Sequence, residues 1–134
     1  MKISNTKEIF NSMEKALKIL DFLIDKKAES PVILEIKDIT YFCDYFVICS
    51  GASERHTRSL YEEAMIFSKK NKIKIHHCED DLLSRWLLID YFDVILHIFH
   101  EEARKFYNIE RLWRKAKKID IRAVSYTHLT LPTN

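Results

Sequence analysis

The sequence predicts a mixed α/β (α+β) domain in which helices pack on a sheet of roughly five strands. Apolar residues recur at helical spacing in two stretches, about 6–27 and 53–70. Short apolar runs suited to strands lie between and after these stretches. Two of the runs, 85–91 and 93–99, are separated by so short a turn that they predict an antiparallel hairpin.

Each helix has a recognisable start. Asn5 followed by Glu8 forms a plausible cap pair for the first helix, and the Ser-Pro dipeptide after it breaks the pattern. Ser53 can cap the second helix, which is expected to end near Lys70. The side chains expected to face inward from the second helix are Leu60, Ala64 and Phe67.

The strands are expected at 32–36, 45–49 and 73–77, followed by the hairpin with its turn near Tyr91 and Phe92. The run at 45–49 is apolar throughout, so it should be buried on both faces. Strand, helix and strand in succession make a βαβ unit, which predicts that the strands beginning at Tyr45 and Ile73 are parallel. A helical pattern resumes at Glu101.

Length and composition indicate one cytoplasmic domain. The chain has 134 residues and a net charge of +2, so bulk charge does not point to nucleic acid. An odd number of cysteines without CxxC spacing fits a reducing compartment, and neither a signal sequence nor a membrane span is recognisable. We assign 1–122 to the domain and 123–134, which lacks charged side chains from Val124 onward, to a vector or adaptor-derived tail.

The turn at 50–53 contains the only glycine of the chain. Such a turn can hold a phosphate at a helix N-terminus, but one glycine is too few for a P-loop. Nucleotidyltransferases share this kind of turn and need an acidic pair for Mg²⁺. Asp90 and Asp93 do not form such a pair, and the strand after the helix carries Lys74 and His76 instead. We therefore expect no catalytic residue and no cofactor.

Histidines raise the question of a zinc site. His76, His77 and Cys78 are adjacent, but neighbouring strand residues point to opposite faces. His77 and His97 could approach each other across the sheet. Solvated or packed histidines are the favoured interpretation, and no metal site is assigned.

The segment from Trp86 to Trp113 is the strongest functional signal. Its characteristic residues are Trp86, Leu88, Asp90, Asp93, Val94, His97, Phe99, Glu102, Arg104, Tyr107, Ile109, Glu110, Leu112 and Trp113. An upstream block adds Asp44, Ile48, Gly51, Ser53, Arg55 and His56. In order and spacing, these residues resemble the ribosomal silencing factor family, the Iojap-like proteins, over about Glu8 to Ala116.

Two positions depart from the family pattern. Phe92 stands where the family has a glycine between two acidic residues, and a phenylalanine is expected to resist a positive φ there. Asp80 stands where the family has a glycine after Glu79. Both changes are expected to affect the shape of their loops.

The resemblance implies a nucleotidyltransferase-like fold without the catalytic acids, and a binding protein rather than an enzyme. Its partner would be the large ribosomal subunit, contacted through that subunit's fourteenth protein. Bound there, it would block subunit joining and repress translation. The residues expected to bind the partner are Trp86, Asp90, Tyr91, Asp93, Arg104 and Tyr107.

The composition of the segment from Trp86 to Trp113 also favours a protein-binding surface, because it is rich in aromatic residues and arginine, which dominate interface hot spots. Among the aromatics, Phe99 and Phe106 are expected in the core, and Trp86 and Tyr91 at the interface. A diverged nucleotidyltransferase-like enzyme and a homodimeric adaptor without a ribosomal role stay open as alternatives. The resemblance also allows a homodimer of the free protein, and direct RNA contact by the basic segment 111–122 is left undecided.

Overall fold

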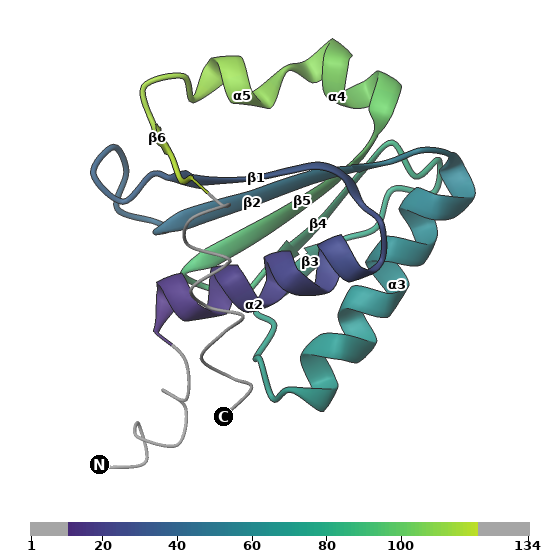
Figure 1. The fold of residues 1–134 in the computed structure, drawn as a ribbon, viewed down its shortest axis with the longest axis horizontal. Coiled ribbons are helices and arrows are strands. Elements are labelled where there is room, and N and C mark those ends of the chain that lie inside the picture. Colours follow the sequence, from purple (N-terminus) through teal and green to yellow (C-terminus); the bar gives the residue numbers. More distant parts are fainter. Residues whose placement is uncertain (1–10, 121–134) are drawn as a thin grey trace.

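The computed structural model describes residues 11–120. In this part of the chain, one mixed sheet lies between two pairs of helices (Figure 1). The sheet has six strands in the order β3-β4-β5-β2-β1-β6. Among these strands, β2 and β5 pair in parallel and the other neighbours are antiparallel. The bounds are β1 Glu29–Glu35, β2 Tyr45–Gly51, β3 His77–Glu79, β4 Trp86–Asp90, β5 Val94–His100 and β6 Lys117–Lys118. The predicted mixed sheet with helices packed on it is confirmed.

Helices cover both faces of the sheet. Helices α2 (Ser12–Asp25) and α3 (Glu54–Lys70) cover one face. The short helices α4 (Glu101–Tyr107) and α5 (Ile109–Leu112) lie over the other, at the top of Figure 1. No helix within residues 11–120 combines the length and apolar character needed to cross a membrane.

Helix α2 begins with a capping box. The Asn11 side chain accepts the Glu14 N–H at 2.8 Å, and the Glu14 carboxylate accepts the Asn11 N–H at 3.1 Å. The cap pair predicted at Asn5 and Glu8 lies outside the described residues. The helix ends at Asp25, slightly before the predicted end.

Helix α3 begins and ends where the sequence predicts. Ser53 Oγ accepts the His56 N–H at 3.0 Å and so caps the helix. Gly51 is required just before it, because a Cβ at this position would lie 2.6 Å from the Thr57 backbone nitrogen. The glycine therefore lets the first turn of α3 pack directly on the end of β2.

Strand β2 is buried along its whole length, as predicted for its uninterrupted apolar run. It lies between β1 and β5, with Val47 opposite Leu96 and Cys49 opposite Ile98. Strand β1 differs from the expected 32–36, because it begins at Glu29 and carries an irregularity between Glu29 and Val32. A bulge tolerates the proline in this stretch, which has no N–H to donate.

The strand predicted at 73–77 is wrong in its extent. Ile73 donates its N–H to Ser68 O at 2.9 Å and closes the end of α3, and pairing begins only near His77. Strand β3 has the same direction as β2, as expected, but β4 and β5 lie between them. The parallel neighbour of β2 is therefore β5.

The predicted hairpin is confirmed. Strands β4 and β5 are antiparallel, with Trp86 opposite Phe99 and Asp90 opposite Ile95. Alternation along both strands separates two cores. The first core, under α2 and α3, is mostly aliphatic and takes from these strands Leu87, Ile89, Val94, Leu96 and Ile98. The second core lies under α4 and α5 and includes Phe46, Ile48, Phe99, Ala103 and Ile109.

Candidate partner-binding surface

The acidic turn between β4 and β5 is closed by its own polar groups. Tyr91 donates its N–H to Val94 O at 2.8 Å, and Asp90 Oδ1 accepts the Phe92 N–H at 2.8 Å. Phe92 has φ 82°, so it adopts the left-handed conformation that its side chain was expected to resist. A non-glycine residue there costs roughly 1–3 kcal/mol, which the surrounding contacts must offset. The Phe92 ring is half-exposed and lies 4.6 Å from the ring of His76.

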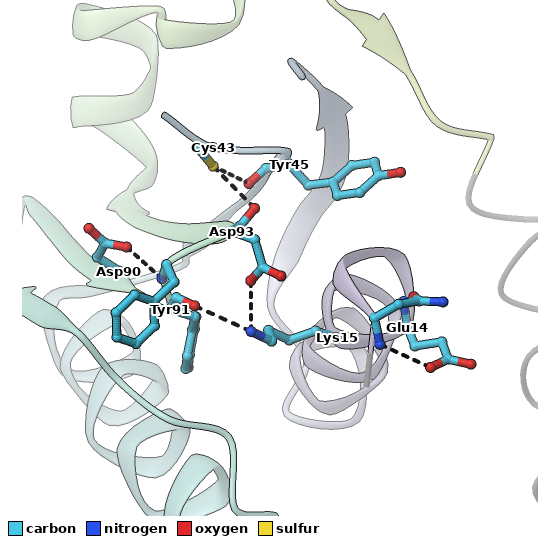
Figure 2. Close-up of polar contacts among 9 residues, drawn as sticks. Glu14, Lys15, Cys43, Tyr45, Asp90, Tyr91 and Asp93 are labelled. Atoms are coloured by element: carbon cyan, nitrogen blue, oxygen red, sulfur yellow. Dashed lines mark hydrogen bonds and ion pairs between the residues drawn. The ribbon is translucent and has the colours of Figure 1, made fainter. Parts of the chain in front are cut away.

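Lys15 of α2 holds this turn from below (Figure 2). Its Nζ donates to Asp93 Oδ1 at 2.6 Å and to Tyr91 O at 3.3 Å. The Asp93 carbonyl accepts the backbone N–H of Asp44 at 2.8 Å, just before β2. Asp93 therefore ties the turn to α2 and to the start of β2, and its charge is already paired within the chain.

A buried thiol lies against the same turn. Cys43 Sγ lies 3.1 Å from Tyr45 O and 3.4 Å from Asp93 O (Figure 2). Burial raises the pKa of Cys43 to about 12, so the thiol stays protonated and unreactive at neutral pH. Burial also raises the pKa of Cys49 to about 12, which agrees with its predicted place in the core.

Tyr91 does not fit its expected place at an interface. The side chain is fully buried, and its hydroxyl hydrogen-bonds Ser68 Oγ at 2.7 Å. Burial raises the pKa of Tyr91 to about 12. The expectation is wrong because Tyr91 is the first residue after β4, and its ring turns under the sheet toward α3.

Trp86 is half-buried at the start of β4, on the side of α4. Its ring stacks on Phe99 at 4.9 Å between centroids and lies 4.9 Å from the ring of Tyr107. Its Nε1–H donates to His97 Nδ1 at 3.2 Å. These contacts hold the indole in one orientation and leave part of it exposed to solvent.

His97 is buried in this aromatic cluster. Burial lowers its pKa to about 3, so the imidazole is neutral at physiological pH. Because Nδ1 accepts from Trp86, the proton lies on Nε2, and within the described residues that atom has no hydrogen-bond partner. The sequence matched His97 to the family but assigned it no role; the structure shows that it orients Trp86.

Helix α4 presents different aromatics from those expected. Phe106 was predicted in the core, but its side chain is 81% exposed. The helix is only seven residues long and buries Ala103 toward the sheet, so the Phe106 side of the helix faces solvent. Tyr107 is 41% exposed and contacts Trp86, which is consistent with its predicted place at a binding surface.

Arg104 is largely enclosed and connects three elements. It forms an ion pair with Glu110 at 3.0 Å, and Nη1 donates to Ser50 Oγ at 2.9 Å. The same nitrogen lies 3.4 Å from Glu29 O. Arg104 thus positions α4 and α5 over β1 and β2, and its guanidinium has little freedom to bind a partner.

The predicted site residues therefore separate by role. On β4, buried residues alternate with three partly exposed residues that face the same side: Trp86, Leu88 and Asp90. We call these three residues, together with Tyr107, the β4 strip. Trp86 and Asp90 are about 13 Å apart along the strand. The alternation appears in the burial of β4 and not in its sequence, which is apolar from Trp86 to Ile89, and nothing local signalled Lys15.

The turn at 50–53 offers little to a phosphate. The Ala52 N–H donates to His56 Nδ1 at 3.0 Å, and the His56 N–H is used by Ser53. Ser50 Oγ accepts from Arg104. Within residues 11–120 no three His, Cys, Asp or Glu side chains gather in a way that could hold a metal, and His77 contacts Glu79 rather than His97.

Comparison with known proteins identifies the family. The family described as "Ribosomal silencing factor during starvation" matches residues 10–131. "Ribosomal silencing factor RsfS" of Halalkalibacterium halodurans is 38% identical over 100 residues, covering 75% of this chain and 86% of that protein.

Structural and more distant similarity agree with this match. A crystal structure of a Bacillus halodurans protein has a TM-score of 0.66 and 35% identity, covering 81% of this chain and 95% of that one. The mouse protein "Mitochondrial assembly of ribosomal large subunit protein 1" is 27% identical over 101 residues, covering 71% of this chain and 43% of that protein. The chain belongs to the ribosomal silencing factor family, as its Trp86 to Trp113 segment predicted.

Proposed function

We propose that the protein binds the large ribosomal subunit through the β4 strip, blocks subunit joining and so represses translation, without catalysis. Membership of the family and the name of the mouse relative support a ribosomal partner. The fourteenth protein of the large subunit is the proposed contact.

The observation that carries this proposal is the packing of Trp86. An indole held by Phe99, Tyr107 and His97, yet half-exposed, is fixed before a partner arrives. Binding then immobilises few additional side chains, which lowers the entropic cost of association. Large aromatic anchors of this kind dominate binding energy at protein interfaces.

The other predicted residues divide into contacts and supports. Asp90, at the far end of the β4 strip, offers a half-exposed carboxylate to a basic partner, and Tyr107 extends the surface beyond Trp86. Asp93 and Arg104 act as supports, because their charges are paired with Lys15 and Glu110. Binding is steric in its effect and requires no cofactor.

Co-sedimentation with purified ribosomal subunits tests the proposal. The protein is expected to pellet with the large subunit alone and to reduce the yield of whole ribosomes when small subunits are added. Pelleting with the small subunit only, or undisturbed joining at saturating protein, would contradict it.

The variant Trp86→Ala tests the proposed anchor. Loss of a central aromatic hot spot costs about 2 kcal/mol or more, so affinity for the large subunit should fall roughly 30-fold or further. Ile66→Ala, an exposed apolar residue on α3 at the opposite face, is the matched control and should bind normally. Circular dichroism at the assay temperature checks that both are folded; normal binding by folded Trp86→Ala would remove Trp86 from the interface.

A further inference from the structure

The end of the described chain carries an uncompensated positive charge. Exposed cations gather from α4 through β6, and within residues 11–120 none of them forms an ion pair: Lys105, Arg111, Arg114, Lys115, Lys117 and Lys118. The acids within the same stretch are Glu101 and Glu102, in the first turn of α4, and Glu110, which is held by Arg104, so cations remain in excess. In Figure 1 this stretch runs along the top of the molecule, from α4 through α5 to β6 at the upper left.

Exposed aromatic rings lie beside these cations. The loop between β1 and β2 presents Tyr41, which is 100% exposed, and Phe42, which is 53% exposed. The Phe42 ring meets Trp113 edge-on at 6.3 Å, so the loop lies against the end of α5. Trp113 packs in turn on Phe46 at 5.2 Å, which anchors this junction in the second core.

The outermost strand extends the charge to the sheet edge. Lys117 lies opposite Glu35 across the β1–β6 pairing, and the Glu35 carboxylate is within 4.0 Å of Lys37 Nζ. Glu35, the acid opposite Lys117, is therefore partly neutralised by another lysine. We call this surface, with Tyr41 and Phe42, the basic edge.

We propose that the basic edge binds single-stranded RNA, with phosphates on its cations and an unpaired base stacked on Tyr41. Rows of unpaired cations beside an exposed aromatic ring are the two components that single-stranded nucleic acid sites combine. Tyr41 is 100% exposed, so its ring is not packed in place for a protein partner as Trp86 is, but it offers a whole face on which a base can stack. The proposal rests on the proposed function in one respect: the RNA within reach would be ribosomal RNA beside the bound protein.

Fluorescence anisotropy with the full chain and a labelled unstructured 12-nucleotide RNA tests this directly. Log affinity should fall steeply with log salt, because cations on phosphates release counterions. The triple variant Lys115→Gln/Lys117→Gln/Lys118→Gln should weaken binding about tenfold or more and reduce the salt slope by about 2. The matched control Lys69→Gln/Lys70→Gln/Lys72→Gln removes the same charge from exposed positions around the end of α3 and should change affinity less than about twofold.

Tyr41→Ala separates base stacking from charge. It should weaken RNA binding about tenfold while leaving the salt slope unchanged, since stacking releases no counterions. Heparin supplies anionic charge without bases, and its binding should not respond to Tyr41→Ala.

Several results would overturn the inference: no RNA binding by the wild type at low salt, equal losses in the two triple variants, or the same response of RNA and heparin to Tyr41→Ala. Tight binding of an acidic protein with no RNA binding would also overturn it. The RNA assay contains no ribosomal subunits, so its failure is distinct from that of the proposed function. A wild type that pellets with large subunits but ignores RNA refutes only the basic edge.

Discussion

The two faces of the sheet differ in chemistry as well as in cover. The face under α2 and α3 is closed and mostly aliphatic, with side chains such as Leu20, Leu23 and Leu96 at 0% exposure. The face beside α4 and α5 has a smaller core that contains an aromatic cluster around the neutral His97, and it leaves Trp86 partly exposed. Along β4 and β5, alternate residues thus pack a closed core on one side and form the proposed binding surface on the other.

Paired truncations on β5 give the largest expected contrast. Leu96→Ala removes a fully buried side chain from the closed face and should lower the free energy of unfolding by about 3 kcal/mol. Its neighbour Ile95→Ala, half-buried on the other face, should cost roughly 1 kcal/mol. Urea unfolding measures both; equal costs would mean that the second face is packed as tightly as the first.

The pH dependence of the free energy of unfolding tests the burial of His97, on the face beside α4 and α5. The pKa of His97 falls from 6.5 to about 3 on burial, so between these values the unfolded chain binds a proton that the native protein does not. Stability should therefore decrease as pH falls below 6.5, by up to about 1.4 kcal/mol per pH unit from this residue.

Comparison with His97→Gln isolates this contribution. Urea unfolding between about pH 6.5 and pH 5 should give a shallower decline for the variant, because all other histidines are retained. Parallel curves for the two proteins would show that His97 can become protonated in the folded state.

Tyr91→Phe tests the assignment of Tyr91 to the closed face. The change removes the hydrogen bond to Ser68 and should cost about 1 kcal/mol, since Ser68 keeps its bond to Ala64 O. Binding to the large subunit should be unaffected in co-sedimentation. Impaired binding at unchanged stability would restore Tyr91 to the interface.

Phe92→Gly is expected to have the smallest effect. Relief of the left-handed strain outweighs the extra entropy of an unfolded glycine and the lost contact with His76, so stability should rise by up to about 1 kcal/mol. Thermal unfolding measures this change. A marked destabilisation would show that the ring contact contributes more than the strain costs.

Local signals in the sequence predicted local structure well. The cap residue Ser53 and the helical spacing of apolar residues predicted α3 to its last residue. The short turn between two apolar runs predicted the β4–β5 hairpin. The neighbour of β2 could not be predicted in this way, because pairing with β5 depends on residues about fifty positions away that no local pattern reports.

For the candidate site, residue type was a weaker guide than position in an element. Phe99 and Phe106 look alike in the sequence, yet one is on a central strand and the other on the outer side of a two-turn helix. Lys15 could not have been predicted, since its contact with Asp93 joins residues that only the folded sheet brings together. Chemical identity alone therefore did not predict which aromatic side chains the fold buries and which it exposes.

The parallel β2–β5 pair also governs how the chain can fold during synthesis. Strand β2 is complete at Gly51, but β5, which pairs with the edge of β2 opposite β1, ends only at His100. A nascent chain emerging from the ribosome must therefore expose an apolar strand edge while roughly fifty further residues are added, several seconds at common elongation rates. Contacts of such long sequence separation slow folding, and an open strand edge invites pairing with other chains. Newly made copies are thus most vulnerable to aggregation before β5 leaves the tunnel, and chaperones would have to protect them during that interval.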